Sequence, residues 1–145
     1  MTHVDSRPST NVVEDINTPA APSLGGVHHL SLTVTNLDLS IPWYRHTFGL
    51  NEIMAEEHAG GRAVVLMHPN GQLFIGLHTH AANDGERFSE TRTGLDHVSI
   101  GVPTRAELVG WEARLRDLGV AYSPIYERSY GALLVFRDPT TFSSS

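Results

Sequence analysis

A repeated segment constrains the fold of this chain more than any other feature of its sequence. Residues 26–34 read GVHHLSLTV, and residues 94–102, which lie 68 positions later, read GLDHVSIGV. Four residues are identical, and the apolar differences are exchanges of similar volume that a core tolerates. Trp43 and Trp111 continue the match at the same offset, as aromatic core anchors of two helices. We therefore expect two copies of one structural unit.

Each copy opens with a strand followed by a helix. Apolar and polar residues alternate over 30–34 and 98–102, which predicts strands with one apolar and one polar face. The second helix should begin after Thr104, which forms a capping box with Glu107, and should end at Gly119. The first helix is expected over residues 38–48, where Pro42 is tolerable because it lies in the first turn.

Short strands should follow each helix. The first copy suggests strands over 52–57, 62–68 and 73–78, and the second suggests strands over 121–126 and 132–137. The last residues, TTFSSS, make a poor strand, so the eighth strand is expected to be missing or altered. These patterns predict an α+β fold of two tandem βαβββ units.

One domain is expected, because the chain has 145 residues and a hydrophobic content of 40%. Residues 1–24 carry prolines among polar residues without apolar periodicity, which predicts a flexible tail. Residues 25–145 would then form the domain, with units at about 25–90 and 93–145.

Composition excludes several classes of function. The chain has no cysteine, so any metal must be bound through nitrogen and oxygen. With 10 Lys and Arg against 16 Asp and Glu, and no basic run, it is unsuited to nucleic acid. Its apolar stretches are too short to span a membrane and there is no apolar signal-peptide core, so we expect a cytoplasmic protein.

Nine histidines make metal binding or proton transfer the first functional hint. His29 and His97 hold equivalent positions in the repeat, each on the polar face of its strand. We predict that both point into a shared cavity, where they bind a metal ion or persist as partly buried histidines without a ligand. We assign no role to His58, which is expected at the surface.

The chain resembles the vicinal oxygen chelate superfamily of glyoxalases, bleomycin-resistance proteins and extradiol dioxygenases. The resemblance covers residues 25–139 and is carried by the segments GLDHV at 94–98, WYR at 43–45 before FGL at 48–50, and VFRDP at 135–139. It implies two curved sheets that form a shared cup, with metal ligands on the first and last strands of each unit. It also implies a small-molecule substrate or ligand and a homodimer.

The sequence departs from the family pattern at the expected acidic ligands. Gly76 stands where the family's last strand usually carries a ligating Glu, and the corresponding strand of the second unit is not evident. His78, two residues later on the same face, could substitute as a ligand, although a strand-end histidine is more often solvated or hydrogen-bonded.

Three functions follow from these observations. In the first, His29, His97 and His78 hold a divalent Fe, Mn, Ni or Zn ion that chelates a small oxygenated substrate, as in a metal-dependent lyase or dioxygenase. In the second, the same cup binds a small molecule without metal, as bleomycin-resistance proteins do. In the third, the chain is an incomplete, inactive relative whose unpaired sheet edge promotes association.

Overall fold

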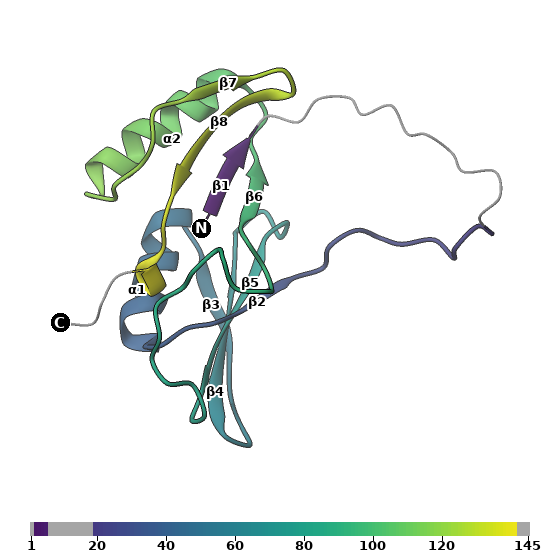
Figure 1. Cartoon of the computed structure of the whole chain (residues 1–145), viewed down its shortest axis with the longest axis vertical. Helices are drawn as coiled ribbons and strands as arrows, with labels where there is room; N and C mark the ends of the chain where they lie inside the picture. Colours follow the sequence, from purple (N-terminus) through teal and green to yellow (C-terminus); the bar gives the residue numbers. More distant parts are fainter. Residues whose placement is uncertain (1, 6–18, 142–145) are drawn as a thin grey trace.

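The computed structural model describes residues 2–5 and 19–141, which form two four-stranded sheets with one helix beside each (Figure 1). The first sheet has the order β2-β5-β4-β3 and the second the order β6-β1-β8-β7. The elements are β1 Thr2–Asp5, β2 Leu30–Thr33, α1 Leu37–Phe48, β3 Asn51–His58, β4 Gly61–Met67, β5 Phe74–His80, β6 Val98–Gly101, α2 Arg105–Asp117, β7 Tyr126–Arg128, β8 Gly131–Phe136 and a 3₁₀ turn at Pro139–Thr141. The α+β class and the tandem units are thus confirmed, and the sheets do not close into a barrel.

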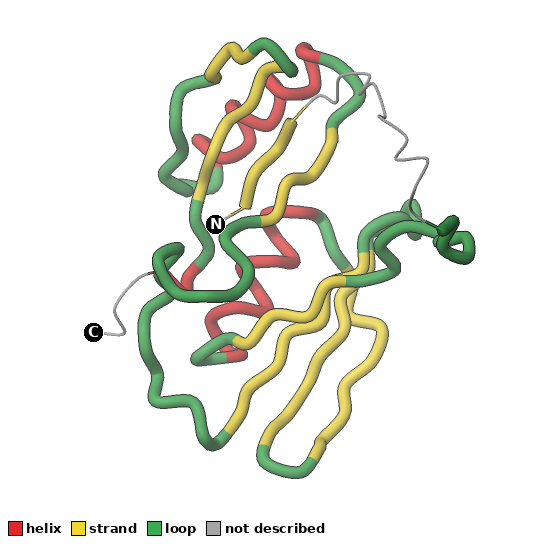
Figure 2. The backbone as a smooth tube through the Cα atoms, turned by 45° about the vertical axis from the view of Figure 1, so that its right-hand side comes forward, coloured by secondary structure: helices red, strands yellow, loops and turns green. Residues whose placement is uncertain are grey.

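The first unit has the predicted succession of a strand, a helix and three strands along the chain. β2 runs parallel to β5, while β4 is antiparallel to both β5 and β3. The turn between β4 and β5 closes where the Gly71 N–H donates to the His68 carbonyl at 2.8 Å, and Gly71 adopts a φ of 71° that favours glycine. The strands of this four-stranded sheet lie side by side, drawn in yellow in Figure 2.

Both helices begin at a side-chain cap. The Asn36 side chain accepts from the Asp38 N–H before α1, and the Thr104 side chain accepts from the Glu107 N–H before α2, as the sequence predicted for the second helix. Pro42 lies inside α1, and α1 ends at Gly49, which has a left-handed φ of 68°. In the part of the chain that the structure describes, no helix is long and apolar enough to cross a membrane.

The second unit differs from its predicted strands. The strand expected over 121–126 is reduced to an isolated bridge between Tyr122 and Phe136, and β7 begins only at Tyr126. Pro124 interrupts the predicted segment, because proline cannot donate a hydrogen bond to a sheet ladder. Residues Pro139–Thr141 form a 3₁₀ turn, and residues 142–145 lie outside the described part.

A strand from the N-terminus completes the second sheet. β1 runs parallel to β6 on one side and antiparallel to β8 on the other. The prediction of a flexible tail over residues 1–24 is therefore wrong for residues 2–5. Residues 6–18 lie outside the described part, and residues 19–24 are exposed without regular structure.

One apolar core joins the two units. Leu66 and Leu77 of the first sheet pack in the same cluster as Leu108 of α2 and Leu134 of β8, and all four are fully buried. Trp43 and Trp111 are partly buried against this cluster, as predicted for core anchors, and Phe48 contacts both of their rings. Residues of both units thus contribute to one apolar cluster.

A buried hydrogen bond also links α1 to the end of the second unit. The Tyr44 hydroxyl donates to Asp138 Oδ2 at 2.6 Å, and the two residues are only 2% and 6% exposed. Burial, with a further contribution from the Asp138 carboxylate, raises the pKa of Tyr44 above its ordinary value. Because the folded-state pKa is raised, the stability that this phenol contributes is present below about pH 10 and is lost as the pH rises further.

We predict that Tyr44→Phe lowers the free energy of unfolding by about 1–3 kcal/mol, because the substitution leaves a buried carboxylate oxygen of Asp138 without its donor. Urea denaturation followed by circular dichroism measures this change. Tyr130→Phe is the matched control, since Tyr130 is 47% exposed and should leave the unfolding midpoint unchanged. Equal midpoints for the two variants would contradict the stabilising role of the Tyr44–Asp138 bond.

Candidate functional site

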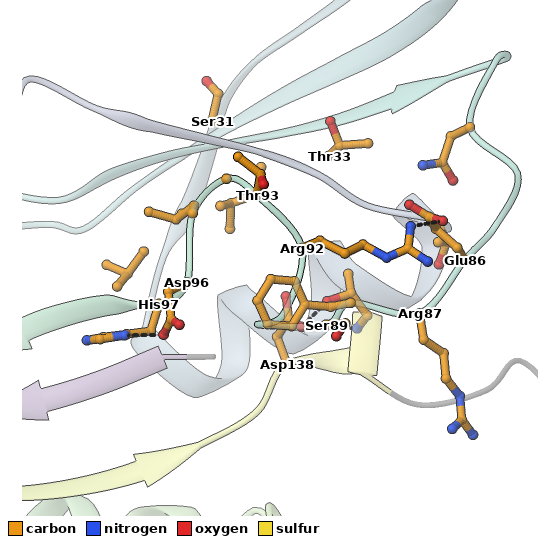
Figure 3. Close-up of a pocket in the computed structure, with 18 of the residues that line it drawn as sticks. Ser31, Thr33, Glu86, Arg87, Ser89, Arg92, Thr93, Asp96, His97 and Asp138 are labelled. Atoms are coloured by element: carbon orange, nitrogen blue, oxygen red, sulfur yellow. Dashed lines mark hydrogen bonds and ion pairs between the residues drawn. The ribbon is translucent and has the colours of Figure 1, made fainter.

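A cavity of about 480 Å³ lies where the two units meet. It is bounded by β2, by the irregular segment that leads into β6, and by the turn after β8 (Figure 3). Its lining is Ser31, Leu32, Thr33, Thr35, Tyr44, Asn83, Glu86, Arg87, Phe88, Ser89, Arg92, Thr93, Gly94, Leu95, Asp96, His97, Val98, Asp138 and Thr140. Polar side chains predominate, which makes the cavity suited to a ligand with several oxygen or nitrogen atoms.

The carboxylates of the cavity already have partners. Glu86 forms an ion pair with Arg92, and Asp96 Oδ1 lies 2.7 Å from His97 Nδ1. The buried Asp138 accepts hydrogen bonds from the Tyr44 hydroxyl and from the Thr140 N–H and hydroxyl. The negative charges are therefore used to hold the cavity wall together, so the cavity does not present a set of free acidic ligands.

Three of the hydroxyl-bearing residues that line the cavity differ from the carboxylates in their hydrogen bonding. Ser31 and Thr33 line the cavity from β2, and Thr93 lines it from the opposing segment (Figure 3). Within the described residues none of these three side chains has a hydrogen-bond partner of its own. They can therefore donate to or accept from a bound molecule.

His97 is the predicted ligand that reaches the cavity. It directly precedes β6, lines the cavity, and has a side chain that is 42% exposed. Besides its contact with Asp96 it takes part in a further interaction. Figure 3 shows the ring at one end of the cavity beside Asp96.

His29 is placed differently from its counterpart in the repeat. It directly precedes β2, is exposed, and is not among the residues that line the cavity. Its Nδ1 atom lies 2.9 Å from Nδ1 of His28, whose ring stacks on Phe74 with 5.8 Å between ring centroids. The repeat therefore gives the two histidines equivalent positions before their strands but different surroundings.

His78 belongs to a group of three imidazoles on the first sheet. Its ring centroid lies 5.7 Å from that of His58 and 6.2 Å from that of His80, and those of His58 and His80 are 5.2 Å apart. The Nε2 atom of His58 is shielded from solvent and has no hydrogen-bond partner in the described part of the chain. The sequence assigned His58 no role, because only the pairing of β3, β4 and β5 brings it near β5.

Two glycines make room on this face. A Cβ atom at Gly61 would lie 1.8 Å from the Thr79 carbonyl oxygen and 2.8 Å from His58 Cε1. At Gly76 it would lie 2.7 Å from Ser31 Oγ and 3.3 Å from His78 Nε2. The absence of a side chain at position 76, where the family pattern leads one to expect Glu, thus allows Ser31 and His78 to approach the strand.

His29, His97 and His78 are not gathered around one point in the structure as described. Among residues 2–5 and 19–141, as far as their side chains are described, no three His, Asp or Glu groups are arranged to hold a metal ion. Binding of one ion by these three histidines would require their side chains to rearrange.

The chain is similar to a known protein family and to one of the curated proteins. The family model described as the Glyoxalase/Bleomycin resistance protein/Dioxygenase superfamily matches residues 26–142. The putative ring-cleaving dioxygenase MhqA of Bacillus subtilis (strain 168) is 30% identical over 128 residues, which cover 88% of this chain. The chain spans 40% of the length of MhqA.

Solved structures show the same architecture. A glyoxylase/bleomycin resistance protein/dioxygenase domain from Frankia sp. EAN1pec has a TM-score of 0.75 and 37% identity, covering 82% of this chain and 93% of that one. The fosfomycin resistance protein FosX of Listeria monocytogenes has a TM-score of 0.62 and 18% identity, covering 82% of this chain and 89% of that one. The second likeness is one of fold alone.

Proposed function

Because this chain belongs to the glyoxalase/bleomycin resistance protein/dioxygenase superfamily, we propose that it binds a small, oxygen-rich organic molecule in the cavity between β2 and the segment leading into β6. The free hydroxyls of Ser31, Thr33 and Thr93 carry this proposal. These three residues line a space of about 480 Å³ in which the carboxylates are already paired. A neutral or singly charged ligand with hydroxyl or carbonyl oxygens suits this lining, because it does not have to compete for charged partners.

We predict that Thr33→Val weakens binding of such a ligand by up to about tenfold, since the change keeps the side-chain volume and removes one hydrogen bond. A panel of small diols, hydroxy acids and hydroxylated aromatic compounds, titrated by NMR, would supply the ligand and its affinity. Its shift changes should map to the cavity lining.

Thr79→Val is the matched control for that experiment. Thr79 lies on the neighbouring strand β5, outside the cavity, so its hydroxyl should not contribute to affinity. If no compound of the panel shifts the cavity resonances, or if both variants bind as the unchanged protein does, the cavity is not the binding site.

A metal-dependent function is the second candidate. Its support is the equivalent placement of His29 and His97 before β2 and β6, with His78 as a third ligand. Among relatives, a FosX variant was crystallised with Mn(II) and 1S,2S-dihydroxypropylphosphonic acid, and MhqA is named as a putative ring-cleaving dioxygenase. In the described arrangement the three histidines do not fit around one ion.

If His29 and His97 bind a divalent Fe, Mn, Ni or Zn ion, His97→Ala should reduce the bound metal from one equivalent to a small fraction of it, because one of the imidazole ligands is lost. Elemental analysis after gel filtration measures the stoichiometry. His46→Ala, on the exposed surface of α1, is the control. Equal metal content in the two variants would exclude this pair of ligands and favour metal-free binding.

We also propose that the protein forms a homodimer through the open edge of the first sheet. β3 is an eight-residue edge strand that is exposed over most of its length, and Ile53 and Met54 on it are each 49% exposed. Unpaired backbone groups and apolar side chains on an edge strand favour association with a second copy.

Sedimentation analysis should then give twice the chain mass of 15.9 kDa. Met54→Lys should shift the protein toward the monomer, because a charged side chain on an edge strand opposes pairing. The control Leu39→Lys places the same charge on α1, at a residue that is 54% exposed, and should leave the dimer intact. A monomer at all concentrations would refute the dimer.

A further inference from the structure

The N-terminal strand lies in a slot that the first unit fills with its own last strand. β5 is parallel to β2 and antiparallel to β4, and β1 is likewise parallel to β6 and antiparallel to β8. The registers also correspond, because Ser99 opposite His3 is the repeat equivalent of Ser31 opposite Gly76. β1 thus holds in the second sheet the position that β5 holds in the first.

The backbone of β6 depends on this arrangement. β6 is the end strand of its sheet, and its neighbour in the sheet order is β1. Without β1, the ladder over Val98–Gly101 is lost and one side of β8 is left unpaired. Unpaired backbone N–H and C=O groups in a sheet are costly or bind another strand.

β6 is also joined to the cavity. Residues 94–97 line the cavity and lead directly into β6, whose first residue, Val98, lines it as well. This wall is therefore continuous in the chain with the strand that pairs with β1.

We propose that the slot between β6 and β8 is a strand-binding site for the chain's own N-terminal segment, and that its occupancy holds the 94–98 wall of the cavity in place. The recognition is backbone pairing of an extended segment, as in strand addition to a sheet edge. The segment reaches the slot through the 24-residue connection 6–29, whose described part, residues 19–29, is exposed and has no regular structure.

A disulfide bond can report the position of β1 without interference, because the chain has no cysteine. The Val135 N–H donates to Ser123 Oγ at 2.8 Å, and its carbonyl accepts from the Ser123 N–H at 2.8 Å, so its backbone faces away from β1. His3 and Val135 are therefore a non-hydrogen-bonded antiparallel pair. Such pairs have Cα atoms about 4.5 Å apart, within the range that a disulfide spans.

The double variant His3→Cys/Val135→Cys of the full chain should form an intramolecular disulfide on mild oxidation, seen as a monomer of altered mobility on a non-reducing gel and by mass spectrometry. The control is His3→Cys/Val65→Cys, since Val65 is the repeat equivalent of Val135 but lies next to β5. This control should remain reduced.

Two results of the oxidation would overturn the proposal. A disulfide yield no greater than that of the control would show that β1 is not in the slot. A disulfide-linked dimer in place of the linked monomer would show that the slot takes the strand of a second copy.

Hydrogen exchange tests the link to the cavity wall. Because His3 and Val135 are not hydrogen-bonded to each other, the adjacent pair Val4 and Leu134 is, and Val4→Pro removes the N–H that Val4 contributes. We expect the β6 amides that pair with β1 to exchange at least about tenfold faster in this variant and the NMR shifts of residues 94–97 to change, while the amides of the equivalent strand β2 keep their rates.

Val27→Pro is the control, because Val27 is 81% exposed and lies in the connection before β2. Exchange that stays slow in β6, or that speeds up equally in β2 and β6, would overturn the coupling between the slot and the cavity wall. The second of these results would indicate general destabilisation. Faster exchange confined to β6, together with shift changes at residues 94–97, would support the coupling.

Discussion

A strand inside a sheet has to satisfy its backbone hydrogen bonds on both sides, and the second unit of this protein meets that requirement by using both ends of the described chain. β8 is paired with β1 on one side and with β7 on the other, and β6 joins the sheet through β1. The parallel β1–β6 pair brings together residues that are almost a hundred positions apart in the sequence. The wall of the cavity that β6 anchors therefore depends on contacts of very long range. The hydrogen bond between Tyr44 and Asp138, which also line the cavity, is another long-range contact.

The sequence predicted most of the first unit because its signals are local. The alternating residues of β2, and in the second unit the Thr104 cap, each specify structure within a few residues, and the structure has them where they were expected. The N-terminal strand escaped prediction because four residues are too few to show a period, and because its pairing partners are distant. The strand expected over 121–126 failed for a local reason, since Pro124 breaks the ladder.

The candidate site was only partly predictable for a related reason. The repeat singled out His29 and His97, and the structure places only His97 among the residues that line the cavity, because an offset in sequence does not specify what surrounds each copy. His29 contacts His28, whereas His97 contacts Asp96, because the residues before them differ. The group of His58, His78 and His80 arises from strand register across Gly61, which no spacing in the sequence reveals.

Glycine at position 76 shows how one departure from the family pattern reshapes a site. A glutamate there would bring a carboxylate to the polar face, but its Cβ atom alone would lie 2.7 Å from Ser31 Oγ and 3.3 Å from His78 Nε2. With glycine, Ser31 and His78 occupy that space instead, and Ser31 lines the cavity with a hydroxyl. The acidic groups that remain in the cavity are bound to Arg92, His97 and Tyr44. In the proposed function, selection of a ligand then rests on hydrogen bonds to its oxygen atoms, because the carboxylates of the wall are held by partners within the wall itself.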